Sequence, residues 1–403
     1  MRILPVGLLL LVPSLVMAQP VADWQQASSS KSAVTSAPLP PLRTEPPALR
    51  TAPEPVSAPF TPALTSAALA SPAPPLVGAI SEVQPSQPAQ SQSRSYGPQR
   101  VSFGGGVSAT FDITYQTLKG FRPLTLDIYQ PARRAWPLPL VVFVHGGGFG
   151  GGDTRHAAGF EDFPGTLAAL AAQGYVVASV NYRLSGEARF PAALLDVKAA
   201  IRWLRAHAAS GDIDTTRVAV WGVASGGQLA ALAGLTCGVP ALEPADLDKD
   251  APSGCVQAVI DWYGATDMKV ADKPATGFTM PATSDGGAFL GCEPAACPPG
   301  LARLASPLSY ISATSPPFLI QHGGADGVVS PAQSQALLAA LKERGVPGEL
   351  VIYPGVGHDF TRNGAPDPGV NQQALARIGA FLATIFPPGP VGVKTAQQRG
   401  PVY

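Results

Sequence analysis

The sequence predicts an α/β fold in which a mostly parallel, twisted sheet carries helices on both faces. Three observations lead to this prediction: apolar runs that do not alternate with polar residues, helical patterns between them, and glycine-rich loops where the runs end. A continuous apolar run is typical of a parallel strand that is buried on both faces. Strands that alternate with helices along the chain form a sheet of this kind.

The expected elements begin shortly after residue 100. The first is a hairpin of strands 111–116 and 124–129, joined by a turn at Lys119 and Gly120. Apolar runs bounded by Gly and Pro then predict strands at 138–144, 175–180, 217–221, 256–262, 317–321 and 350–353. Patterns with helical periodicity predict helices at 166–172, 192–207, 228–235, 331–344 and 371–386.

The composition of the chain changes on either side of this folded region. Residues 1–18 combine an early cation with a short apolar run and small residues before Gln19, which is typical of a cleaved signal peptide. Residues 19–100 are rich in Pro, Ala, Ser and Gln, and such a segment buries too little apolar surface to fold, so we expect a disordered linker. A catalytic domain at 101–388 and a flexible tail at 389–403 complete the expected organisation. The signal peptide predicts a secreted or periplasmic protein.

Charge and composition narrow the class of ligand. The formal net charge is zero, and charged residues make up 13% of the chain. A nucleic-acid groove or a polybasic membrane patch needs a local excess of Lys and Arg, so we expect neither. No stretch after the signal peptide resembles a membrane span. We expect a neutral or apolar small-molecule or carbohydrate ligand and no metal or organic cofactor, and the oligomeric state is left open.

The four cysteines are expected to form disulfides, because an exported protein with an even number of cysteines usually pairs them. Of the three possible connectivities we prefer the two local pairs, Cys237 with Cys255 and Cys292 with Cys297. A metal site is the alternative, but no His stands near these cysteines at ligand spacing.

The loop after strand 138–144 is a candidate oxyanion hole. Ligands of parallel sheets bind at the carboxyl ends of the strands, so the strand-to-helix loops are where a site is expected. The sequence HGGGFG at 145–150 contains consecutive glycines, which let backbone N–H groups point inward without a Cβ in the way. A phosphate loop would instead need Lys followed by Ser or Thr. We assign Gly147 and Gly148 to the oxyanion hole and expect His145 to support the loop.

Two later loops supply an acid and a base. HGGAD ends at Asp326 after strand 317–321, and PGVGHD places His358 after the last strand. The order of nucleophile turn, Asp and His is that of Ser-Asp-His hydrolases built on parallel sheets. Asp326 would orient the imidazole of His358 and stabilise its protonated form. The rival acids are Asp359, whose side chain should diverge from that of its neighbour, and Asp267, which lacks a glycine-rich loop.

Together these motifs resemble a known family. The segments HGGGF, NYRLSGEARFPAALLDVKAAIRWLRAHA, VAVWGVASGG, HGGAD and PGVGHDF are similar to those of α/β-hydrolase esterases related to hormone-sensitive lipase. The closest likeness is to the bifunctional feruloyl and acetyl xylan esterase type, over roughly residues 101–386. The resemblance implies the α/β-hydrolase fold, carboxylic ester hydrolysis, Asp326 and His358 as triad members, and oxyanion donors at Gly147 and Gly148.

The nucleophile turn WGVASGG departs from the pattern of this family. Aligned without a gap on W-G-x-S-x-G-G, it places Ala224 where the reactive serine belongs and Ser225 one residue later. Three interpretations follow. The chain carries alanine in place of a reactive serine, or it uses Ser225 with Asp326 and His358 in a rewound turn, or it is a pseudo-hydrolase that binds esters without turnover. A peptidase like prolyl oligopeptidase is a further alternative, which the HGGG loop disfavours.

Residues 269–307 interrupt the core between two predicted strands. This segment contains Cys292 and Cys297 and many small residues. We predict that it forms a partial lid over a substrate pocket lined by Trp262 and Tyr263. Ordinary core packing is the alternative for both aromatic residues.

Overall fold

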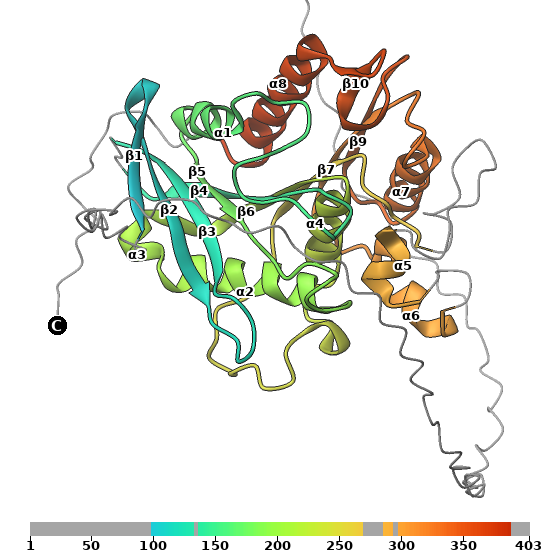
Figure 1. The fold of residues 1–403 in the computed structure, drawn as a ribbon, viewed down its shortest axis with the longest axis horizontal. Coiled ribbons are helices and arrows are strands. Elements are labelled where there is room, and N and C mark those ends of the chain that lie inside the picture. Colours follow the sequence, from blue (N-terminus) through green and yellow to red (C-terminus); the bar gives the residue numbers. More distant parts are fainter. Residues whose placement is uncertain (1–97, 133–135, 269–284, 293–296, 388–403) are drawn as a thin grey trace, which may run out of the picture. The chain divides into compact units, whose positions relative to one another are not determined.

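A nine-stranded sheet forms the centre of the computed structural model, which describes residues 98–132, 136–268, 285–292 and 297–387 (Figure 1). The strand order in this sheet is β1-β2-β3-β5-β4-β6-β7-β8-β9. The first three strands are antiparallel to their neighbours, and β5, β4 and β6 to β9 run parallel. The α/β-hydrolase fold predicted from the sequence is therefore confirmed.

The strands are β1 Gln99–Phe103, β2 Val107–Gln116, β3 Leu124–Pro131, β4 Leu138–Val144, β5 Val176–Val180, β6 Ile213–Val223, β7 Ala258–Trp262, β8 Phe318–Gly323 and β9 Gly348–Tyr353, with a separate ribbon of β10 Thr361–Arg362 and β11 Ala365–Pro366. The α-helices are α1 Phe163–Ala172, α2 Ala192–Ala206, α3 Ala208–Gly211, α4 Ser225–Leu235, α5 Asp285–Leu290, α6 Pro299–Leu304, α7 Pro331–Glu343 and α8 Pro368–Ile385. Short 3-10 turns are η1 Gly104–Gly106, η2 Pro240–Leu242, η3 Pro307–Tyr310 and η4 His358–Phe360.

Strand β1 is the main departure from the predicted elements. It begins at Gln99, just inside the expected linker, and pairs with β2 at the edge of the sheet. Its residues are mostly exposed, so the strand lacks the apolar run on which the prediction depended. The expected signal peptide, most of the linker, the tail and residues 269–284 lie outside the described residues.

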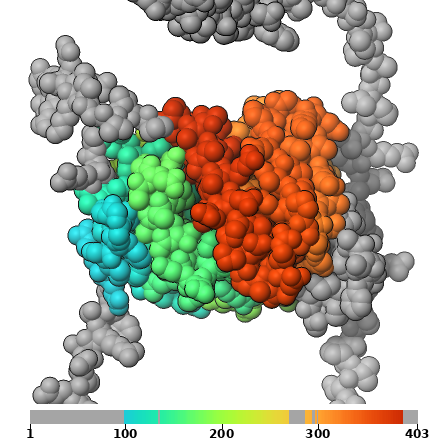
Figure 2. All heavy atoms as spheres, turned by 90° about the horizontal axis from the view of Figure 1, so that it is seen from above, coloured from blue at the N-terminus to red at the C-terminus, as the bar shows by residue number. Residues whose placement is uncertain are grey.

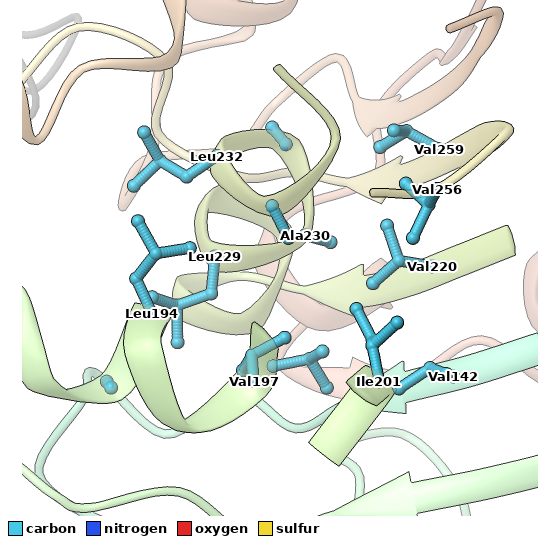
Figure 3. Packing of buried hydrophobic residues seen from close by; sticks show 14 of the residues in the cluster. Val142, Leu194, Val197, Ile201, Val220, Leu229, Ala230, Leu232, Val256 and Val259 are labelled. Carbon is cyan, nitrogen blue, oxygen red and sulfur yellow. The ribbon is translucent and has the colours of Figure 1, made fainter. Parts of the chain in front are cut away.

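Helices cover both faces of the sheet. On one face α2 turns the apolar stripe Leu194, Val197 and Ile201 toward the sheet, at the spacing of a single helical face. Figure 3 shows this stripe in one cluster with residues of α4, of the central strands and of the segment before β7: Leu229, Ala230, Leu232, Val142, Val220, Val259 and Val256. All residues of α4 are buried, because it lies between α2 and the sheet.

Helices α1 and α8 cover the other face, where they lie side by side (Figures 1 and 2). Asp162 caps α1 by accepting the N–H of Gly165 at 2.8 Å, and Asp367 caps α8 in the same way. Their apolar side chains meet the aromatic rings of Phe143 and Trp221 in one cluster. Among the described helices, none is both long and apolar enough to cross a membrane.

A buried cation holds the loop that follows α4. The ammonium of Lys198 on α2 is fully buried and donates to the carbonyls of Thr236 and Leu242, both at 2.9 Å, and to the Glu243 carboxylate at 2.7 Å. Burial lowers the pKa of Lys198, and these acceptors keep the charge compensated. The preferred disulfides are both present, Cys237–Cys255 around this loop and Cys292–Cys297 in the insertion.

We predict that the double variant Cys237→Ala, Cys255→Ala unfolds more easily. The disulfide closes a loop of sequence separation 18, and its removal releases conformational entropy to the unfolded chain. The expected loss in the free energy of unfolding is about 3 kcal/mol. Urea denaturation with and without reductant measures it. An unchanged midpoint in the variant, or a midpoint that reductant still lowers by the same amount, contradicts the prediction.

Candidate active site

The turn from β6 into α4 has the geometry of a nucleophile elbow, with Ala224 at its tip. Ala224 adopts φ 50° and ψ −119°, a conformation that side chains other than glycine rarely adopt. A Cβ on Gly222 would overlap the carbonyl of Gly226, and a Cβ on Gly226 would overlap the carbonyls of Val144 and His145. The two glycines that the elbow requires are therefore Gly222 and Gly226, and the residue between them is Ala224.

Ser225 lies one residue beyond the elbow. It is the first residue of α4, it is 7% exposed as a residue with a buried hydroxyl, and it lies next to Tyr182. No hydrogen bond joins it to His358 in the described part of the chain. This backbone therefore does not support the assignment of Ser225 as nucleophile, because a rewound turn would have to bring Val223 to a position that is crowded by the helix.

The HGGG loop lies directly against the elbow. A Cβ added to Gly146 would be 3.4 Å from the Cβ of Ala224. Gly147 and Gly148 have φ values of 106° and 60°, and the N–H groups of Gly150 and Gly151 both donate to the carbonyl of Gly147, at 3.1 and 3.0 Å. Within the described ranges the N–H groups of Gly147 and Gly148 themselves donate to no protein acceptor. Unpaired N–H groups beside the elbow are the requirement for binding an oxyanion.

His145 supports this loop as a neutral side chain. Its ring stacks on that of Tyr182 with 4.3 Å between centroids, and the Tyr182 hydroxyl donates to the carbonyl of His145 at 3.0 Å. The Nδ1 of His145 lies 2.8 Å from the carbonyl of Gly146, so it is the protonated nitrogen. Complete burial lowers the pKa of His145 to about 4. The imidazole therefore remains uncharged at neutral pH and is not the catalytic base.

Asp326 and His358 come together at the carboxyl ends of β8 and β9. The Nδ1 of His358 is 2.7 Å from Oδ2 of Asp326, and the other carboxylate oxygen accepts the N–H groups of Val328 and Val329. Burial acts to raise the pKa of Asp326, but the hydrogen bonds from the histidines beside it outweigh burial and hold this pKa well below its ordinary value. Burial acts to lower the pKa of His358, and the Asp326 hydrogen bond and charge raise it overall. A permanently ionised acid thus faces a base that readily accepts a proton.

The rival acid Asp359 is not placed like Asp326. Its Oδ1 is 4.0 Å from Nε2 of His358, the nitrogen on the opposite side of the ring from the Asp326 bond. The other rival, Asp267, lies five residues after the end of β7, and its backbone N–H donates to the side chain of Gln333 on α7.

Trp262 and Tyr263 are both buried among core residues, as the core-packing alternative expects. Trp262 is fully buried, donates its indole N–H to Gln321 at 2.6 Å, and packs edge-on against Trp221. Tyr263 is 1% exposed, and its ring meets that of His358 edge to face at 4.8 Å between centroids. It therefore supports the base. The last residues of a buried central strand face the core rather than an open pocket.

The described part of the 269–307 insertion contacts the oxyanion loop. Phe289 of α5 stacks on Phe149 of the HGGGF motif with 3.9 Å between ring centroids, and its carbonyl accepts the N–H of Phe190 at 2.8 Å. Residues 269–284, where most of the predicted lid would lie, are outside the described residues.

The sequence matches the BD-FAE family over residues 126–341, which is more than half of the chain. The chain belongs to the BD-FAE family. A shorter match, over residues 299–388, is to the prolyl oligopeptidase family. The two matched ranges overlap over residues 299–341, and Asp326 lies in this overlap.

Relatives of this BD-FAE chain are named as esterases. Esterase LipQ of Mycobacterium tuberculosis is 34% identical over 262 residues, which cover 63% of this chain and 58% of LipQ. The chain thus spans less than two thirds of that relative. A truncated carbohydrate esterase from gut microbiota aligns with a TM-score of 0.56 and 28% identity, over 69% of this chain and 95% of that one. Thermogutta terrifontis esterase 2 phosphorylated by paraoxon aligns with a TM-score of 0.56 and 28% identity, over 70% and 96% of the two chains.

Two residues near the BD-FAE site were not assigned a role from the sequence. His322 heads the HGGAD motif and contacts Asp326, and its spacing of four residues from that acid was the available signal. Asp261 precedes Trp262 on β7, and a side chain on Gly227 at the start of α4 would overlap its carboxylate. Asp261 is the only charged residue of the apolar strand β7. A charged residue inside such a strand indicates a buried carboxylate with specific partners.

We predict that Asp261 makes the protein less stable as the pH rises. Asp261 is fully buried, its Oδ1 accepts the N–H of Gly264 and no other donor among the described residues, and burial raises its pKa from 3.8 to about 6. As the pH rises through this interval, the unfolded chain releases the proton before the folded one does, so the free energy of unfolding falls.

The fall should amount to at most about 3 kcal/mol, and Asp261→Asn should abolish it. Urea denaturation at several pH values between roughly 4 and 7 measures it, and the exposed Asp246→Asn is the matched control. Equal pH dependence in the parent and in Asp261→Asn would show that Asp261 is ionised in the folded protein.

Proposed function

We propose that this chain binds carboxylic esters in a hydrolase site that keeps its oxyanion loop, acid and base and holds Ala224 at the nucleophile position. The conformation of Ala224 carries the proposal, since it occupies the elbow between Gly222 and Gly226. Support also comes from the unpaired N–H groups of Gly147 and Gly148 and from the Asp326–His358 pair. The relatives named as esterases favour an ester ligand.

With a hydroxyl at residue 224, the site would carry out acyl transfer in two steps. His358 would take the hydroxyl proton as the oxygen attacks the ester carbonyl, and the N–H groups of Gly147 and Gly148 would stabilise the oxyanion. His358 would then protonate the leaving alcohol, and water would release the acid by the reverse sequence. The methyl group of Ala224 cannot form an acyl-enzyme, so the chain is expected to bind esters with little turnover.

For the substrate we propose acyl groups carried by a carbohydrate, such as acetyl or feruloyl esters of xylan. This finer assignment is supported by the resemblance of the sequence motifs to feruloyl and acetyl xylan esterases. It is also supported by the likeness to a carbohydrate esterase from gut microbiota. The neutral overall charge suits an uncharged polymer. A peptidase activity is the alternative that the partial prolyl oligopeptidase match favours.

We also propose that the protein acts outside the cytoplasm. The signal-peptide composition of residues 1–18 and the two disulfides support export, because disulfides persist in oxidising compartments.

We predict that Ala224→Ser creates esterase activity. Hydrolysis of 4-nitrophenyl acetate should rise on the order of 10³-fold or more over the parent, because the added hydroxyl completes the acyl-transfer machinery. A fluorophosphonate probe should label residue 224 of the variant and leave the parent unlabelled, as mapped by peptide mass spectrometry.

A control separates the two candidate serines. In the Ala224→Ser background, Ser225→Ala should keep the activity and the labelling. An adduct on Ser225 of the parent chain would instead show that the turn rewinds and that the chain is an active esterase. Acetylated xylan, methyl ferulate and a dipeptide anilide then distinguish carbohydrate esterase from peptidase.

A further inference from the structure

We propose that His322 is a positioning residue of this site: its Nε2–H holds the Asp326 carboxylate in the orientation that faces His358. The inference goes beyond the proposed function and depends on it only for the kinetic part of its test. It begins from the hydrogen bonds of Asp326, whose carboxylate is buried on all sides.

Each oxygen of the Asp326 carboxylate meets two donors. Oδ1 accepts the N–H groups of Val328 and Val329, at 2.8 and 2.9 Å. Oδ2 lies 2.7 Å from Nδ1 of His358, and Nε2 of His322 lies 3.2 Å from it, at ion-pair distance. An ionised carboxylate offers about two acceptor positions on each oxygen, and in the described part of the chain these two imidazoles are the groups that Oδ2 meets. His322 thus borders Oδ2 on the side away from His358.

His322 is itself fixed on both sides of its ring. It is fully buried on β8, with Nδ1 2.6 Å from Oγ of Ser334 on α7 and Nε2 2.9 Å from the carbonyl of Val329. Nε2 faces two acceptors, this carbonyl and the Asp326 carboxylate, so it carries a proton. On the other side of the ring, Nδ1 and the Ser334 hydroxyl form a hydrogen bond that fixes the plane of the imidazole. The contact with Ser334 on α7 thereby orients the ring so that Nε2 faces Asp326.

Few other ionisable groups face His358. From its own loop Asp359 lies 4.0 Å from Nε2, from β7 the ring of Tyr263 packs at 4.8 Å between centroids, and from the β8 loop Asp326 bonds Nδ1. In the described part of the chain two groups contact both His322 and His358: the Asp326 carboxylate and the ring of Tyr263, which lies 6.4 and 4.8 Å from the two imidazoles between centroids. Asp326 is the charged one of the two, so a change at His322 that alters the titration of His358 is expected to act through the position or charge of that carboxylate.

The first test uses the chain with Ala224 and needs no turnover. The chain has five histidines, and the exposed His207→Gln is the matched control for NMR titration with labelled imidazole rings. His322→Leu should lower the pKa of His358 by roughly one pH unit, because the hydrogen bond to Asp326 weakens. His322→Gln, which keeps an N–H donor near Nε2, should restore most of the shift.

An unchanged pKa of His358 in His322→Leu overturns the proposal, because His322 would then only fill space. A raised pKa also overturns it, because His322 would then weaken the attraction between Asp326 and His358 rather than support it. If His322→Leu does not fold, Ser334→Ala replaces it. Ser334→Ala keeps the imidazole and removes its outer hydrogen-bond partner, and it should lower the pKa of His358 by a smaller amount. No change in that variant also contradicts the proposal.

The kinetic test uses the Ala224→Ser background. Adding His322→Leu should lower kcat roughly ten- to hundredfold and leave KM within about twofold, because the base is misaligned and ester binding is not. Adding His322→Gln should recover most of kcat. An equal loss in both variants, or a change confined to KM, would falsify the positioning role. If Ala224→Ser is inactive, the proposed function fails, and the NMR titration still decides the role of His322.

Discussion

Backbone crowding where β6 turns into α4 is the constraint on which the whole site depends. Gly222 and Gly226, which lie two residues before and two residues after Ala224, must both lack a Cβ. A Cβ on Gly222 would overlap the backbone of Gly226, and a Cβ on Gly226 would overlap the end of β4. The same contact brings the last residues of β4 beside the elbow, so the HGGG loop starts from a fixed point. The Ala224 N–H donates to the carbonyl of Trp262 at 2.9 Å, which ties the turn to the next strand as well. The oxyanion loop and the nucleophile position are thus fixed by contacts among the carboxyl ends of β4, β6 and β7.

Electrostatics then give two nearby histidines opposite properties. His145 is enclosed and hydrogen-bonds the carbonyl of Gly146 rather than a carboxylate, so burial lowers its pKa in spite of the charge of Asp153 and keeps the ring neutral. His358 has the ionised Asp326 beside it, so its pKa is raised in spite of burial. Burial alone would disfavour charge on both rings, and the position of a single carboxylate decides which one can act as a base.

The architecture could be predicted from the sequence because parallel strands buried on both faces leave an unambiguous apolar signal. Strand β1 gave no such signal, since an exposed edge strand is polar. Glycine-rich loops at the strand ends also led to Asp326 and His358, because few other residues permit such turns. The spacing of WGVASGG could not decide between Ala224 and Ser225, since that decision depends on a φ angle and on contacts between segments. The position of Trp262 near a strand end likewise did not reveal which way its ring points, and only tertiary packing sets that direction.

An elbow built by backbone contacts keeps its shape whatever small side chain stands at its tip. Alanine and serine codons differ at a single base, so reactive and unreactive forms of this protein are one nucleotide substitution apart. With alanine at residue 224, the glycine contacts and the Asp326–His358 hydrogen bond are all in place. The residue at the tip of the elbow can therefore change between alanine and serine without a change in the backbone contacts that build the turn.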